Sequence, residues 1–206
     1  MDSIEIQIAS SRHLGYARDI SDLIRESAKN RGTGIAKRSP NYITQKINEH
    51  KAIIAVTNLG ELAGFCYIES WGNTKYVANS GLVINHKFRN QGLAKRIKKL
   101  AFQHSTKMFP KAKLFGLTTS LPVMKINSEL GYEPVTFSEL TDDDEFWKGC
   151  QSCVNYEILQ KKNRSNCLCT GMLYNPSVNK MKKKNFWNKS KWFSRLGNIR
   201  KKINEK

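Results

Sequence analysis

Hydrophobic residues along the chain follow two periodicities, and their order predicts the secondary structure. Near the start every second residue is apolar, as at Ile4, Ile6 and Ile8, which is the period of a half-buried β-strand. From Leu14 onward apolar residues recur three or four positions apart, which is the period of an amphipathic helix. Over the whole chain these patterns predict strands at 4–8, 52–57, 62–69, 76–84, 113–119, 133–137 and 155–159, and helices at 14–28, 40–48, 93–108 and 122–130.

Turn and cap residues support several of these boundaries. Pro40 suits the first turn of a helix, and Gly131 suits the position just after one. The turn Asn58-Leu59-Gly60-Glu61 joins two apolar runs as a hairpin. The resulting order is strand, two helices, three consecutive strands, helix, strand, helix and final strands, without an internal repeat.

The segment between the fourth strand and the third helix is suited to phosphate binding. The first amides of a helix have no partner inside the helix, and the helix dipole adds partial positive charge there. A glycine in such a turn lets the backbone approach a ligand closely. The segment consists of Arg89, Asn90, Gln91, Gly92, Leu93 and Ala94. An ordinary strand-to-helix turn is the alternative interpretation.

This segment matches the R/Q-x-x-G-x-G/A signature of the GNAT acyltransferases, and the order of elements over about residues 4–160 resembles that family. The resemblance implies an α/β (α+β) fold. Its central sheet would be mixed and mostly antiparallel, splayed between the fourth and fifth strands, with helices on both faces. It also implies acetyl-coenzyme A (acetyl-CoA) as cosubstrate, with the pyrophosphate on residues 89–94. The pantetheine arm would pair with Leu82, Val83 and Ile84. Lys95 and Arg96 would add nearby charge, or lie on a solvated helix face.

The resemblance is weaker at the proton donor. Many GNAT enzymes have a tyrosine five residues before the aromatic of a Leu-Gly-aromatic ending, which here is Leu130-Gly131-Tyr132. The matching residue is Asn127, whose amide cannot act as an acid but can hydrogen-bond the thiol or thiolate. Glu69, at the end of the third strand, is the candidate base, with a surface charge as the alternative. His86 is a weaker candidate and is expected to be structural.

The resemblance also implies that the acceptor lies beside the loop between the first two helices. This loop carries two glycines and several cations, among them Arg31, Lys37 and Arg38. Because arginine binds carboxylates through two parallel hydrogen bonds, these residues favour a carboxylate-bearing acceptor, although a solvated basic loop has the same composition.

Several segments also resemble small stand-alone N-acylglutamate synthases, namely residues 31–36, 65–69, 77–81 and 146–150. That resemblance implies L-glutamate as the amine, acetyl-CoA or succinyl-CoA as donor, and a role in arginine biosynthesis. Transfer to a protein or another small amine, or a non-catalytic acyl-CoA-binding module, are the alternatives. A homodimer is a further possibility.

Four cysteines follow the region of resemblance. Cys150 and Cys153 form one close pair, and Cys167 and Cys169 form another. Two close pairs in a cytosolic chain predict a structural four-thiolate zinc site, which would clasp an extension at residues 150–176 onto the domain at 1–160. Unligated thiols are the alternative. Cys66, inside a predicted strand, is expected in the core.

Charge separates the end of the chain from the rest. Of a formal net charge of +18, residues 177–206 carry +10, from nine Lys and two Arg against one Glu. Apolar residues three or four apart predict a basic amphipathic helix in this tail, suited to an anionic membrane, RNA or a protein partner. A disordered tail, or a helix packed on its own domain, is the alternative. No signal peptide or apolar run long enough to cross a membrane is recognisable, so the expected location is cytoplasmic.

Overall fold

A computed structural model describes residues 3–31 and 36–179, with the side chain of Arg31 left out. The chain divides into a compact unit, Met1–Tyr174, and a second unit, Asn175–Lys206, of which only residues 175–179 are described. The predicted tail helix therefore lies outside the described residues. No described helix is both long and apolar enough to cross a bilayer.

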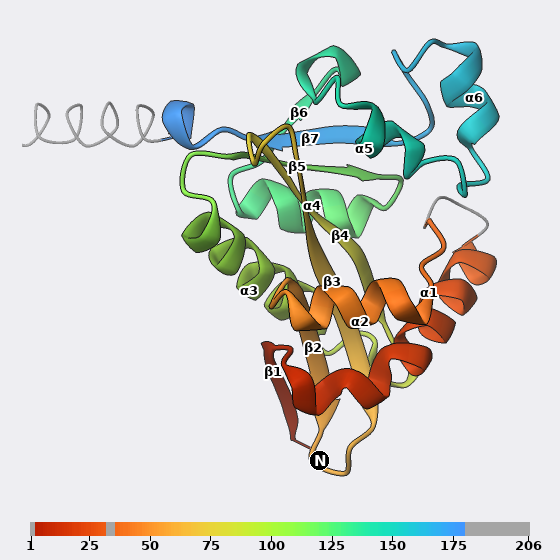
Figure 1. Ribbon diagram of the computed structural model, residues 1–206, viewed down its shortest axis with the longest axis vertical. Coiled ribbons are helices and arrows are strands. Elements are labelled where there is room, and N and C mark those ends of the chain that lie inside the picture. The colour runs from red at the N-terminus through yellow and green to blue at the C-terminus, as the bar shows by residue number, and fades with distance from the viewer. Residues whose placement is uncertain (1–2, 32–35, 180–206) are drawn as a thin grey trace, which may run out of the picture. The chain divides into compact units, whose positions relative to one another are not determined.

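The first unit contains the elements that form the sheet and its covering helices (Figure 1). The strands are β1 Ile4–Ile8, β2 Ala52–Thr57, β3 Leu62–Trp71, β4 Tyr76–Ile84, β5 Lys113–Thr118, β6 Glu133–Val135 and β7 Thr170–Tyr174. The α-helices are α1 Ala17–Arg31, α2 Pro40–Asn48, α3 Leu93–Met108, α4 Leu121–Glu129, α5 Asp144–Lys148 and α6 Tyr156–Lys161. Short 3-10 turns are η1 Ser11–Tyr16, η2 His86–Phe88 and η3 Phe137–Glu139.

The described strands form one sheet in the order β1-β2-β3-β4-β5-β7-β6. Only β4 and β5 pair in parallel, and the other neighbours in this sheet pair antiparallel. The α/β (α+β) class with a mixed, mostly antiparallel sheet is thus confirmed.

Helices cover both faces of the β2–β4 half of the sheet. Successive residues of a strand point to opposite faces of the sheet. On one face Ile54 and Phe65 pack against α1 and α2, and on the other Ile53 and Cys66 pack against α3. Ser39 caps α2 by accepting a hydrogen bond from the Tyr42 amide at 3.2 Å, ahead of Pro40 in the first turn. Cys66 lies in the core, as expected.

The β5–β7 half of the sheet is covered differently. On one face Leu114 and Met172 pack with residues of α3, α4 and the turn after α4. On the other face Phe115 packs with Trp147 of α5 and Leu159 of α6. The segment after β6 therefore forms a second cover over this half, which lies next to the candidate site.

Strands β4 and β5 separate soon after they start. They pair only over Tyr76–Ala78 and Lys113–Phe115, although β4 continues to Ile84 and β5 to Thr118. The pairing of β4 with β3 is also irregular, because its register shifts between Phe65 and Tyr67. Gly81 lies in this bulge with φ +63°, and a β-carbon there would lie 2.4 Å from Cε1 of Tyr67. Only glycine fits this position without strain.

The end of the unit corrects the sequence analysis. The strand predicted at 155–159 is wrong, because the segment forms helix α6. Val154 and Ile158 are exposed whereas Leu159 is buried, so the segment has no alternating strand face. The sheet instead gains β7, which lies within the segment that the sequence set apart as an extension.

We predict that Gly81→Ala destabilises the protein by about 2 kcal/mol, because the left-handed backbone and the Tyr67 ring both oppose a side chain. Urea unfolding followed by circular dichroism measures this loss. Gly15→Ala is the matched control, since a β-carbon at Gly15 meets nothing within 4 Å. Equal unfolding midpoints for the two variants would contradict the role given to Gly81.

Candidate active site

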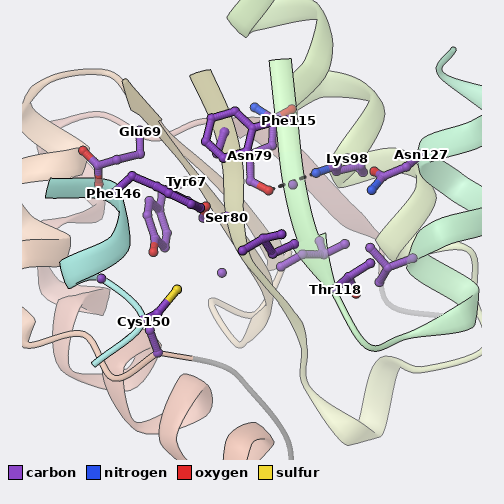
Figure 2. Close-up of a pocket in the computed structure, with 18 of the residues that line it drawn as sticks. Tyr67, Glu69, Asn79, Ser80, Lys98, Phe115, Thr118, Asn127, Phe146 and Cys150 are labelled. Atoms are coloured by element: carbon purple, nitrogen blue, oxygen red, sulfur yellow. Dashed lines mark hydrogen bonds between the residues drawn. The ribbon is translucent and has the colours of Figure 1, made fainter. Parts of the chain in front are cut away.

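A cleft opens where β4 and β5 diverge (Figure 2). Its walls come from β3, β4, β5, α3, α4, the segment just before α2, and α5 with the two residues after it. Figure 2 shows Glu69, Tyr67 and Cys150 on one side of this cleft and Lys98 and Asn127 on the other. The cleft thus brings together residues that are far apart in the sequence.

Glu69, the predicted base, lines the cleft and is held by two donors from α2. Lys46 Nζ donates to its Oε1 at 2.6 Å, and the Tyr42 hydroxyl donates to its Oε2. Burial raises the pKa of Glu69 to about 7, against the opposing charge of Arg38. A carboxylate that titrates near neutrality can accept a proton under ordinary conditions. Glu69 is therefore both fixed in position and suited to act as a base.

Arg38 lies at the same end of the cleft. Its Nε donates to the Tyr67 hydroxyl at 2.8 Å, and its Nη1 donates to the Lys37 carbonyl at 2.8 Å. Its guanidinium also lies 5.0 Å from the centre of the Tyr42 ring. Among the described residues no hydrogen bond uses Nη2, so this group is available to an acceptor.

The other predicted acceptor cations are placed differently. The Lys37 side chain is exposed and is not part of the cleft wall, while its backbone amide donates to Ser152 Oγ at 3.2 Å. The side chain of Arg31 and residues 32–35 lie outside the described part of the chain. Arg38 is thus the predicted cation that the structure places at the cleft.

Asn127 of α4 also lines the cleft. It is 1% exposed, and its Oδ1 is buried without a hydrogen-bond partner among the described residues. A buried polar atom without a partner is destabilising unless a ligand or water satisfies it. Asn127 is therefore able to bond a ligand group from this side.

The sequence analysis missed Lys98, which lines the cleft from α3. It is 2% exposed, and its Nζ donates to the Asn79 carbonyl of β4 at 2.9 Å. Burial lowers its pKa. Its place in the helix was the available signal: Lys98 lies three residues before Ala101 and seven before Ser105, on the buried face of α3.

The predicted phosphate turn has the backbone that the sequence suggested. Asn90 and Gly92 have φ of 62° and 71°, and Gly92 directly precedes α3. Arg89, Asn90, Gln91 and Gly92 are exposed, whereas the Leu93 side chain is buried in the core. The free amides at the start of this 16-residue helix therefore face solvent, where an anion can reach them.

The neighbouring residues divide between backbone and packing roles. Leu82 lines the cleft, while the side chains of Val83 and Ile84 pack in the two cores on either side of the sheet. Only their backbone groups are thus available to a ligand. Lys95 pairs with Glu129 at 2.8 Å, and His86 is exposed in η2 outside the cleft.

Solved structures with this arrangement of strands identify the fold. Acetyltransferase of the GNAT family from Staphylococcus aureus Mu50 matches with TM-score 0.57 and 13% identity, over 84% of this chain and 99% of that one. The chain has the GNAT fold. No protein-family model matches it, and no curated protein matches its sequence.

Two further GNAT-fold structures carry small ligands. N-acetylglutamate synthase from Neisseria gonorrhoeae, complexed with coenzyme A and N-acetyl-glutamate, matches with TM-score 0.60 and 17% identity over 84% of this chain. The match covers 35% of that synthase, so this chain spans about a third of its length. Diaminobutyrate acetyltransferase EctA from Paenibacillus lautus, in complex with its substrate and coenzyme A, matches with TM-score 0.56 and 10% identity, over 85% of this chain and 96% of that one.

The cysteines of this GNAT-fold chain do not support the predicted zinc clasp. No group of three or more His, Cys, Asp or Glu in the described ranges is placed to hold a metal ion. Cys150, Cys167 and Cys169 instead pack against the hydrophobic cluster around Trp147, and burial raises the pKa of Cys150 to about 11. Cys153 is only partly buried. Pairing of β7 with β5 and β6 attaches the end of this segment to the sheet.

We predict that Gly92→Asp weakens binding of coenzyme A about tenfold or more, because a carboxylate at this turn repels the pyrophosphate. Isothermal titration calorimetry measures the change. Asp tolerates the left-handed backbone better than most residues, so folding should be preserved. Gly60→Asp, at another exposed positive-φ glycine in the β2–β3 turn, is the control and should bind like wild type. Equal affinities for the two variants would place the pyrophosphate elsewhere.

Proposed function

We propose that this protein is an N-acyltransferase that moves an acetyl group from acetyl-CoA to the amino group of a small carboxylate-bearing acceptor, with L-glutamate as the favoured substrate. The observation that carries the proposal is the cleft between β4 and β5, which has a carboxylate base at one end and unpaired strand edges along its length. Acetyl transfer needs a held thioester, a polarised carbonyl and a neutral amine.

The donor fits the open edge of β4. Beyond Ala78 this strand does not pair with the described β5. The Asn79 and Ser80 carbonyls accept from Lys98 and Cys66, and the remaining backbone groups on that side would pair with an extended pantetheine arm. The bulge at Gly81 interrupts the regular pairing of β4 with β3, and Gly81 lines the cleft. An amide there would polarise the thioester carbonyl. The turn at 89–94 continues from the same strand and would hold the pyrophosphate.

The amine fits the end of the cleft at Glu69. An amine attacks the thioester only after losing its proton, and Glu69 is placed to receive it. The hydrogen bonds from Tyr42 and Lys46 favour the carboxylate form, so the base is present at and above neutral pH. This is the role the sequence analysis expected for Glu69.

The acceptor specificity rests on Arg38. Its free Nη2 and Glu69 lie at the same end of the cleft, which suits an α-amino acid with its carboxylate on one and its amine on the other. An adjoining hollow is lined by Arg38 and Glu69 together with Trp71, and gives room for a side chain. Glutamate is favoured by the sequence resemblance and by the ligand named for the Neisseria synthase. Such a product would place the protein in arginine biosynthesis.

An acceptor screen tests this function directly. Thiol release from acetyl-CoA and succinyl-CoA is measured with glutamate, other amino acids and amines without a carboxylate. We expect glutamate with acetyl-CoA to give the fastest release. Release no faster with any amine than with water, together with tight coenzyme A binding, would indicate a non-catalytic acyl-CoA-binding module.

We predict that Arg38→Gln raises the KM for the amino-acid acceptor about tenfold or more, because it removes the cation that binds the carboxylate. The KM for acetyl-CoA should stay within about twofold. Lys37→Gln, one residue earlier with an exposed side chain, is the matched control and should behave like wild type. An unchanged acceptor KM in Arg38→Gln would exclude Arg38 as the carboxylate site.

We predict that kcat/KM rises with pH through about 7, because only deprotonated Glu69 accepts the amine proton and burial raises its pKa to about 7. Glu69→Gln should lose about 100-fold in activity and the acidic limb of the pH profile with it. The exposed Glu61→Gln serves as the control. An acidic limb that survives in Glu69→Gln would assign the titration to another group.

A further inference from the structure

Lys98 is an unusual residue for the interior of this fold. It lies on the buried face of α3 next to Ile97, and burying an ammonium group is costly unless a partner offsets the loss of water. The described residues place no carboxylate within ion-pair distance of its Nζ. Its hydrogen bond is to the neutral carbonyl of Asn79, at 2.9 Å. An ammonium has three donors, so two remain for a ligand.

The groups around Lys98 do not neutralise it. Cys66 of β3 contributes the only charge effect that raises its pKa, but burial raises the pKa of that thiol to about 11, so it is uncharged at neutral pH. The Tyr132 ring centre lies 5.8 Å from Nζ, and burial also raises the pKa of Tyr132. The Tyr132 hydroxyl donates to Asn79 Oδ1 at 3.2 Å, and Asn79 Nδ2 donates to Ser105 Oγ at 2.6 Å. Among the described residues, Lys98 is thus a buried cation without an anion.

Its position in the cleft indicates which anion it meets. Lys98 and Asn127 line the same wall, from α3 and α4, and lie near each other in Figure 2. Asn79, which Lys98 contacts, is two residues before the bulge at Gly81, where the thioester carbonyl would be held. When the thioester C–S bond breaks at this point, negative charge develops on the leaving sulfur. The donor Lys98 and the unpaired acceptor Asn127 Oδ1 lie beside it.

We propose that Lys98 is the general acid of this enzyme and protonates the sulfur of coenzyme A as it leaves, with Asn127 Oδ1 accepting the hydrogen bond of the S–H group so formed. The proposal rests on the proposed acyltransferase function. It assigns the proton to a helix different from the one that carries the tyrosine of many GNAT enzymes, at whose position this chain has Asn127.

The proposed step balances as follows in atoms and charge. The amine nitrogen attacks the carbonyl carbon, a C–N bond forms, and the C–S bond breaks with its electron pair passing to sulfur. Before the attack Glu69 takes one proton from the acceptor ammonium and passes it to water. After the attack Glu69 takes the second proton from the nitrogen, and a proton of the Lys98 ammonium goes to sulfur. After the thiol and the amide leave, Glu69 releases its proton to water and Lys98 takes one from water.

Burial suits Lys98 to this step. An ordinary lysine, with a pKa near 10.4, is a weaker acid than a thiol with a pKa near 8.5. Burial lowers the pKa of Lys98 and so makes its ammonium group a stronger acid than that of an ordinary lysine. Below that lowered pKa Lys98 carries the proton that it donates, and above it the activity falls.

The test compares Lys98→Met with Lys98→Arg. Methionine keeps the length of the side chain without charge, whereas arginine keeps the charge but does not release a proton in this pH range. We expect both variants to lose about 100-fold in kcat and the alkaline limb of the pH–rate profile. Wild-type kcat with an unchanged alkaline limb in Lys98→Met would overturn the proposal, as would full activity in Lys98→Arg.

A binding measurement keeps the proposal testable apart from turnover. The affinities for coenzyme A and for desulfo-coenzyme A are compared from pH 6 to 10 by calorimetry. In wild type we expect the affinity for coenzyme A to rise relative to that for desulfo-coenzyme A as the pH increases, because the thiol ionises beside the Lys98 ammonium. In Lys98→Met we expect the ratio of the two affinities to stay constant. Equal pH dependence in the two proteins would refute the contact between Lys98 and sulfur.

The two measurements separate failure of this inference from failure of the proposed function. If the wild type binds coenzyme A but acetylates no amine, the function is wrong while the affinity comparison still reports on Lys98. Desulfo-coenzyme A also checks the fold, because it should bind wild type and Lys98→Met alike. If Lys98→Met does not fold, Lys98→Arg decides through its kcat and its alkaline limb.

Discussion

The structure depends on the early separation of β4 and β5. Backbone amides and carbonyls must find partners when they are buried, and a sheet normally supplies them from the next strand. Here the parallel pairing ends at Ala78 and Phe115, while the outer edge of β5 is already occupied by β7. The bulge at Gly81 prevents β4 from following a regular ladder. The cleft therefore lies along a stretch of β4 that the described β5 does not pair with, and the fold itself keeps these two strands apart.

Burial shifts the pKa values of two groups along this cleft in opposite directions. At one end Glu69 is held by Tyr42 and Lys46, and burial shifts its titration to near neutrality. On the other wall burial disfavours the charged form of Lys98. Desolvation acts on both groups but moves their pKa values in opposite directions, towards each other. Groups whose proton affinities have converged are suited to accept a proton at one point and give one at another during a single transfer.

Much of the fold and part of the site could be predicted from the sequence, because local rules govern them. The period of the apolar residues located the helices that cover the sheet, and Gly92 marked the turn ahead of α3 because few other residues adopt its backbone. Glu69 was proposed as a base from the family resemblance, since it ends the third strand, and the structure places it in the cleft wall. Lys98 was missed because a lysine in a helix is usually exposed, although its spacing from Ala101 and Ser105 places it on the buried face of α3.

The errors lie where partners distant in sequence decide the structure. The short strand β7 contains a glycine and has no marked alternation, so its pairing with β5 and β6 was not visible locally. The four cysteines have spacing typical of zinc ligands, but spacing along the chain does not fix the positions of the sulfur atoms. Packing around Trp147 determines where three of them lie.

The insertion of β7 between β5 and β6 has a consequence for how the protein matures. In the described sheet β6 pairs only with β7, which follows it by more than thirty residues. During synthesis the first five strands can therefore assemble in order, while β6 has to wait until Thr170–Tyr174 has left the ribosome. Until then the outer edge of β5 has no strand partner. The last strand thus closes the nascent sheet late in translation, after every residue that lines the cleft has been made.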